Sequence, residues 1–304
     1  MRSLGAIAAA VFAMAIAGRA HAFQCTQGSS NDFVSIYWTT RLIPVAFRGG
    51  ASTTIPSEAL DRILRDSFNA WTSASCSDIE FEFRPIVADD PPYDSLLCEG
   101  KRSEKTVFDK AVGLDQVSQV VIVHDCWTED HDSSVLALTT MTYGARDGVI
   151  RYGVIEINER RSIETQGFAF EEVTSQPSCR AQGDVFDLAA VVTHEVGHFL
   201  GLGHTDMRGL TVSSGDRPTM TAIVDPCDTD FATISADDLD GLCYIYPRGQ
   251  GARQCLPLPE QETPYITTVA FGCQSTPGGG GDVLVSGLLG LLCAMTCSKP
   301  RSRR

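Results

Sequence analysis

Hydrophobic positions along the chain switch between the period of helices and the period of strands. Residues 57–71 carry apolar side chains at helical spacing on one face, which predicts an amphipathic helix; these are Leu60, Ile63, Leu64, Phe68 and Trp71. Residues 79–84 alternate apolar and charged side chains, the pattern of a half-buried strand. Residues 117–123 are strongly apolar and predict a central strand.

Further strands are predicted at residues 41–47, 136–143 and 149–157. The last two are joined through Asp147-Gly148, a turn signal that favours a hairpin. A helix is predicted at 186–200, and Ser235 begins a capping-box-like start of a final helix over 236–244. The polar stretch 85–110 reads as a loop. The elements together predict an α/β (α+β) fold with a mixed twisted sheet.

The two ends of the chain read as targeting segments. Arg2, an apolar stretch and the small-residue site Ala20-His21-Ala22 indicate a signal peptide over residues 1–22, so that the mature chain begins at Phe23. A membrane anchor or a buried helix is the alternative. Residues 249–281 are rich in Pro and Gly and predict a linker. Residues 282–304 hold an apolar run followed by a basic tail, which predicts a membrane anchor.

Composition narrows the function. Of the 304 residues 43% are apolar and 20% charged, which is ordinary for a globular protein, and the net charge of −14 argues against nucleic-acid binding. Eight of the eleven cysteines precede the C-terminal region; they are Cys25, Cys76, Cys98, Cys126, Cys179, Cys227, Cys243 and Cys255. An even number in an exported chain favours disulfides. A cysteine zinc site is the alternative, and the absence of a Cys-x-x-Cys pair among the eight disfavours it.

One short run carries most of the chemistry, HEVGHFLGLGH at residues 194–204. His194 and His198 are four apart, so a helix projects both imidazoles from one face toward one ion. Gly201 tolerates the positive φ that ends a helix, and the turn brings His204 back as a third ligand. Three imidazoles leave a position for water, and the neighbouring Glu195 is placed to accept a proton from it. Histidines on a helix by chance are the alternative.

This run resembles the signature of the metzincin metallopeptidases, HExxHxxGxxH followed by a methionine turn. The resemblance implies one catalytic Zn²⁺ on the three histidines and makes Met220, in Pro218-Thr219-Met220-Thr221, the methionine of that turn. Thr205 and the absence of a tyrosine two residues after Met220 make the chain most similar to the matrixin branch. The likeness spans residues 41–247 and implies a catalytic domain over 23–248.

The resemblance also has implications beyond the zinc site. Metzincins bind peptides as an added strand along an edge strand, which implies that residues 136–143 are that edge, with Leu136, Leu138 and Thr140 along it. The histidine and aspartate sets that form the family's structural zinc and calcium sites have no match in this sequence. His124 is expected to cap a strand end and His131 to lie in a solvated loop. Ca²⁺ at Asp225, Asp228 and Asp230 lacks support, because their spacing matches no known calcium loop.

The sequence therefore predicts a zinc endopeptidase that acts as a monomer on proteins or peptides. A zinc amidase on cell-wall substrates and a non-catalytic surface adhesin are the alternatives; Glu195 argues against the adhesin, because a structural zinc site does not need it. The end of the chain resembles tripartite bacterial sorting signals, which implies retention of the secreted protein at the cell envelope. Cys273 is then the processing or anchoring residue, or else an unpaired cysteine.

Overall fold

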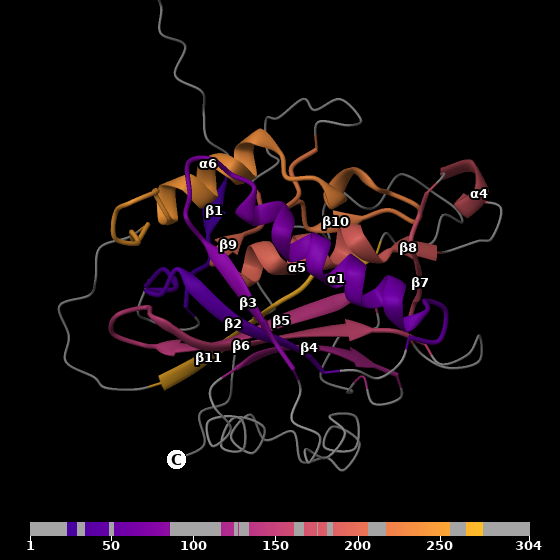
Figure 1. The fold of residues 1–304 in the computed structure, drawn as a ribbon, viewed down its shortest axis with the longest axis horizontal. Helices are drawn as coiled ribbons and strands as arrows, with labels where there is room; N and C mark the ends of the chain where they lie inside the picture. The colour runs from indigo at the N-terminus through magenta and orange to yellow at the C-terminus, as the bar shows by residue number, and fades with distance from the viewer. Residues whose placement is uncertain are drawn as a thin grey trace, which may run out of the picture.

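The computed structural model describes residues 23–28, 34–48, 52–85, 117–124, 127, 134–160, 167–174, 176–180, 185–205, 217–255 and 266–275. The fold is mixed α/β, as the sequence predicts, with a six-stranded sheet covered on one face by helices (Figure 1). The strands lie in the order β11-β5-β6-β4-β2-β3. Their bounds are β2 Leu42–Arg48, β3 Glu80–Arg84, β4 Ser118–Val123, β5 Ala137–Gly144, β6 Ile150–Asn158 and β11 Ile266–Phe271.

The sheet is mixed because the connections differ in length. β2 pairs in parallel with both β3 and β4, and β4 pairs in parallel with β6. β5 and β6 are antiparallel and are joined by a short connection in which Gly148 has a φ of 66°, so the predicted hairpin is present. β11 then adds antiparallel to the outer side of β5.

Alternating side chains divide the sheet into two faces. Met141 and Tyr143 of β5 join the main core beneath the helices, whereas Leu138 joins a smaller cluster with Val121 and Trp127. Helix α1 (Ser57–Thr72) buries all five of its predicted apolar positions in the main core. Phe68 of α1 packs edge-on against Phe81 of β3, with 4.8 Å between the ring centroids.

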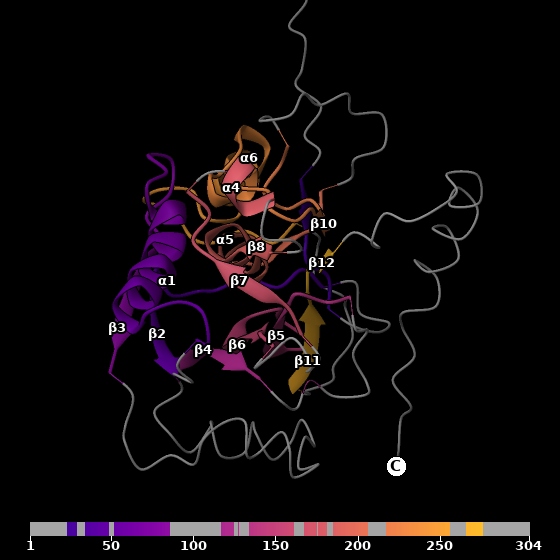
Figure 2. The same cartoon turned by 90° about the vertical axis from the view of Figure 1, so that its right-hand side faces the viewer.

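Helix α5 (Leu188–Phe199) lies beside α1 on the same face of the sheet and packs on β5 and β6 (Figure 2). Every residue of α5 except Ala189 is buried. Its first turn is capped by Asp187, whose carboxylate accepts a hydrogen bond from the Ala190 amide at 3.1 Å. At its other end, Trp38 donates to the carbonyl of Phe199 at 2.7 Å and Tyr246 donates to that of Leu200 at 2.7 Å. These bonds satisfy carbonyls that a helix end leaves without a partner.

The final predicted helix is α6, Ala236–Ile245, and it begins with a complete capping box between Ser235 and Asp238. The smaller elements are β1 Gln24–Cys25, β7 Ala169–Glu171, α4 Gln176–Arg180, β8 Val185–Asp187, β9 Leu202–Gly203, β10 Ile223–Val224, the 3-10 helix η1 Asp230–Ala232 and β12 Gln274–Ser275. Among the described residues, no helix is both long enough and apolar enough to cross a membrane. Residues 1–22 and 282–304, the predicted signal peptide and anchor, lie outside the described residues.

Three disulfides join described cysteines: Cys25–Cys255, Cys76–Cys243 and Cys179–Cys227. They use six of the eight cysteines that the sequence assigned to disulfides, while Cys98 and Cys126 lie outside the described residues. Cys25–Cys255 ties the first strand to a residue beyond the predicted end of the catalytic domain at 248.

The linker prediction over residues 249–281 needs a correction. Within it, residues 266–271 form β11 of the main sheet and residues 274–275 form β12, which pairs in parallel with β10. The run Ile-Thr-Thr-Val-Ala-Phe at 266–271 has the β-branched and aromatic composition of a strand. Because Pro and Gly residues on both sides of this run dominate the composition of residues 249–281, that composition predicts a linker and not a strand.

Candidate metal centre

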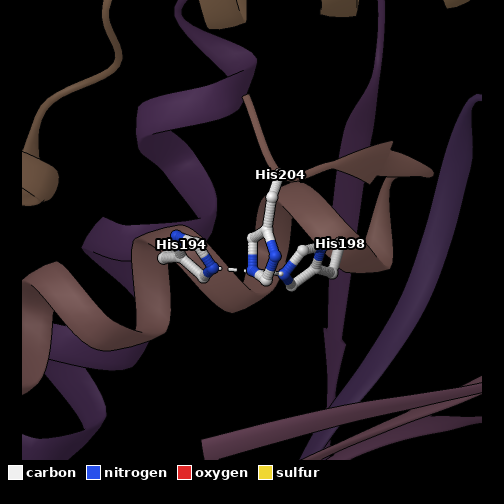
Figure 3. A group of neighbouring side chains, drawn as sticks. All are labelled: His194, His198 and His204. Carbon is white, nitrogen blue, oxygen red and sulfur yellow. Dashed lines mark hydrogen bonds between the residues drawn. The ribbon is translucent and has the colours of Figure 1, made fainter. Parts of the chain in front are cut away.

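Three histidines converge at the end of α5 (Figure 3). His194 and His198 lie one turn apart on the same side of the helix, and both are fully buried. Gly201 ends the helix with a φ of 90°, and the chain returns through β9 to His204. The Nε2 atom of His198 lies 3.1 Å from the Nε2 of His194 and 3.1 Å from that of His204.

The backbone fixes the orientation of two of the rings. The Nδ1 atom of His194 lies 2.6 Å from the carbonyl oxygen of Thr219, and the Nδ1 of His198 lies 2.8 Å from that of Leu202. A carbonyl only accepts hydrogen bonds, so both Nδ1 atoms carry the proton and both Nε2 atoms present a lone pair. Such contacts to the outer nitrogen are what metal-binding histidines make.

The convergence of these lone pairs fits a zinc ion. Neighbouring nitrogens that both lack a proton repel each other unless a cation lies between them. Zinc–nitrogen bonds of about 2.0–2.1 Å in a tetrahedral arrangement place two ligands roughly 3.3 Å apart, close to the separations here. Burial lowers the pKa of His194 to about 3 and that of His204 to about 4, so both rings are neutral, as metal ligands must be.

Glu195 is the third functional group of the helix, and its carboxylate is fully buried. Its Oε2 accepts a hydrogen bond from the hydroxyl of Thr139 on β5 at 2.6 Å, and its Oε1 accepts one from the backbone amide of Cys273 at 3.0 Å. Burial raises the pKa of Glu195 to about 7, against the lowering effect of these hydrogen bonds. A carboxylate in this range exchanges protons readily at neutral pH.

Met220 lies directly under the helix. A side chain at Gly197 of α5 would overlap the sulfur of Met220, so the glycine allows this close approach. The amides of Thr219 and Met220 donate to the carboxylate of Asp238 at 2.7 and 3.2 Å. Asp238 therefore holds the turn whose Thr219 carbonyl orients His194.

The edge strand predicted for substrate is not an edge in this structure. Leu136 lies just before β5, and its amide donates to the carbonyl of Cys273 at 3.0 Å. Leu138 and Thr140 lie within β5, and Thr140 is paired with Ala270 of β11. The outer side of β5 is covered by β11, a strand that lies within the predicted linker over residues 249–281.

The remaining candidate ligands have other partners. His124 lies at the end of β4, as expected for a strand-end residue, and its Nε2 is 2.8 Å from a carboxylate oxygen of Glu159. Asp225 and Asp228 both contact Arg217, at 3.4 and 2.8 Å, so a cation already faces these two acids. His131 lies outside the described residues. Cys273 is buried and takes part in no disulfide.

The sequence alone does not indicate two residues that support the candidate metal centre. Thr139 reads as an ordinary strand residue, and only the pairing of β5 with the sheet brings its hydroxyl to Glu195. Asp238 was visible as part of a capping box, but its contacts with Thr219 and Met220 join segments separated by 19 and 18 residues. Local sequence patterns do not predict contacts between residues so far apart in the chain.

Comparison with known families agrees with this geometry. The family model described as Matrixin matches residues 37–247, which covers the sheet from β2 to β6, the three histidines and α6. No curated protein matches the chain.

Proposed function

Because the chain belongs to the matrixin family of zinc metallopeptidases, we propose that it is an endopeptidase whose zinc is held by His194, His198 and His204. The observation that carries this proposal is the convergence of the three imidazoles beside a buried carboxylate. The alternatives of a cell-wall amidase and a surface adhesin find no such support, because the family is one of peptidases.

The proposed chemistry assigns one role to each group. Zinc, when bound, polarises the scissile carbonyl and lowers the pKa of a water toward neutrality. Glu195 accepts the proton from that water and delivers it to the leaving amine. Thr139 holds Oε2 of Glu195 in place, and Oε1 would face the reacting atoms once the Cys273 amide no longer donates to it. The substrate is a protein or peptide segment, and the enzyme acts as a monomer.

Chelation and one isosteric substitution test the proposal together. A quenched-fluorescence peptide library is incubated with the protein before and after treatment with a zinc chelator, and again after zinc is restored. Glu195→Gln keeps the shape of the side chain but cannot take a proton. We expect it to retain zinc and to lose about 10²–10⁴-fold in kcat. Cleavage that survives both chelation and Glu195→Gln would show that another centre is responsible.

We also propose that the protein is exported and held at the cell envelope by residues 282–304. The disulfides among the described cysteines support export, because such bonds persist in oxidising compartments. Processing at Cys273 requires this residue to leave its buried position beside Glu195. Fractionation of cells that produce the full chain, with and without Lys299–Arg304, tests the location. Equal release of both forms into the medium would contradict retention.

A further inference from the structure

The C-terminal arm, defined here as residues 266–275, runs along β5 and reaches Glu195, the neighbour of His194 in the candidate metal centre. Its first part, β11, pairs antiparallel with β5 from Ile266 opposite Gly144 to Phe271 opposite Thr139. Figure 2 shows β11 at the outer side of the sheet, next to β5. β5 is also the strand along which the family resemblance places a bound peptide, and a second strand cannot pair with the same backbone groups.

The second part of the arm is held on its other side. β12 pairs in parallel with β10, with Gln274 opposite Ile223 and Ser275 opposite Val224. β10 follows the Met220 turn by only a few residues. The arm is therefore held between β5 and the segment that follows the turn. Gly272, between the two pairings, lies so close to β5 that a side chain there would collide with the carbonyl oxygen of Ala137.

Cys273, which lies between the two paired segments of the arm, contacts the proposed base. The amide of Cys273 donates to Glu195 Oε1 at 3.0 Å, and the Cys273 side chain is fully buried. Thr139 takes the other carboxylate oxygen. The oxygen that Thr139 leaves for the reacting atoms, Oε1, thus accepts a hydrogen bond from the arm of this same chain.

We propose that the C-terminal arm is an intramolecular inhibitor that occupies the substrate position and keeps the enzyme latent until it is displaced. The inference rests on the proposed function, since latency has meaning only for a peptidase. The arm blocks the site in two ways, by filling the pairing edge of β5 and by engaging Glu195 through Cys273. Cleavage of the chain between Cys255 and Ile266 frees the arm, while the disulfide Cys25–Cys255 stays with the catalytic domain.

Substitutions within the full chain test the arm directly. Successive amides along a strand point to opposite sides, so a proline pair at Val269 and Ala270 removes one hydrogen bond to β5 whichever amide faces it. Gly272→Ala disturbs the same contact with a single methyl group. We expect either variant to raise kcat/KM on a short peptide roughly tenfold or more, because the tethered arm competes with substrate at high effective concentration.

The matched control is a proline pair at Gln261 and Glu262, outside the paired strand, which should leave kcat/KM at the parent value. Nicking separates latency from folding: a site for a specific protease is placed within residues 256–265, and the folded chain is cut and diluted. Activity should rise after cutting. Equal activity of parent, proline pair, Gly272→Ala and nicked chain would overturn the inference while leaving the proposed function intact.

A binding measurement keeps the inference testable even if no peptide is cleaved. A fluorescent peptide with the sequence of residues 266–275 is titrated into parent and variant proteins, and its anisotropy is followed. We expect binding to the Val269/Ala270 proline variant and to the nicked chain after removal of the arm, but not to the parent. Failure to bind any form, or equal binding to all, would show that the arm does not occupy an exchangeable site.

Discussion

The hydroxyl of Thr139 on β5 donates a hydrogen bond of 2.6 Å to Oε2 of Glu195 on α5. This bond links the strand that would hold the substrate to the group that would move the proton. Thr139 is fully buried, and its partner is the carboxylate of a neighbouring element rather than a residue of its own strand. We regard Thr139 as a positioning residue for Glu195.

Replacing Thr139 tests this relationship. Thr139→Val keeps the branched shape and removes the donor, so we expect kcat to fall about tenfold, the loss of a hydrogen bond worth roughly 1.4 kcal/mol, with KM little changed. The hydrogen bond lowers the pKa of Glu195, so its loss raises that pKa and moves the acid limb of the rate profile to higher pH. Thr139→Ser should restore both. The measurement is kcat against pH, with intact and nicked protein.

Zinc binding should depend on His198, whose Nε2 lies 3.1 Å from the Nε2 atoms of both His194 and His204. We expect about one zinc per purified chain and a near-complete loss of zinc in His198→Ala, because two ligands do not hold the ion firmly. Elemental analysis after dialysis measures this. His131→Ala is the control and should keep its zinc. Full occupancy in His198→Ala would remove the three-histidine assignment.

The contact between Gly197 and Met220 should limit the size of the side chain that α5 accepts at position 197. Gly197→Ala places a methyl group against the Met220 sulfur and near Trp71, and overpacking of this kind costs about 1–3 kcal/mol of unfolding free energy. Thermal unfolding should show a lower Tm. Gly251→Ala, which meets nothing within 4 Å, is the control and should not move it. Adding Met220→Ala to Gly197→Ala relieves the overlap, so the two effects should not add; strict additivity would contradict the contact.

Asp187 should make stability depend on pH. Burial raises its pKa to about 6, against the hydrogen bonds from Val173 and Ala190, while an unfolded aspartate titrates near pH 3.9. Between these values the folded state holds a proton that the unfolded state has lost, so stability falls as pH rises. The unfolding free energy of the parent minus that of Asp187→Asn should drop by roughly 2 kcal/mol from pH 4 to pH 6. Urea unfolding measures it, and a constant difference would show that Asp187 does not titrate there.

The elements with strong periodicity could be predicted from the sequence because their signals are local. The helix predicted at 57–71 is α1 at Ser57–Thr72, and the strand predicted at 149–157 is β6 at Ile150–Asn158. The motif helix was predicted from 186, whereas α5 begins at Leu188, because residues 185–187 form β8 and Asp187 caps the helix. Caps and short strands depend on partners that local patterns do not show.

The metal centre could be predicted in part. Spacing alone indicated that His194, His198 and His204 share an ion, because a helix and a glycine turn fix their relative positions. The covering of β5 could not be predicted, since pairing between residues about 130 positions apart depends on where the chain returns. The pairing of two strands so far apart in the sequence produces no periodic pattern in either strand.

The disulfide between Cys25 and Cys255 gives the C-terminal arm an anchored starting point on the catalytic domain. Only residues 256–265 lie between that anchor and β11, so the arm is presented to its site at an effective concentration in the millimolar range, typical of short tethers. A contact too weak to inhibit as a separate peptide therefore suffices within the chain. One peptide-bond cleavage in this tether lowers that concentration to the level of the free protein. Activation by such a cut would be abrupt, and in dilute solution it would not reverse.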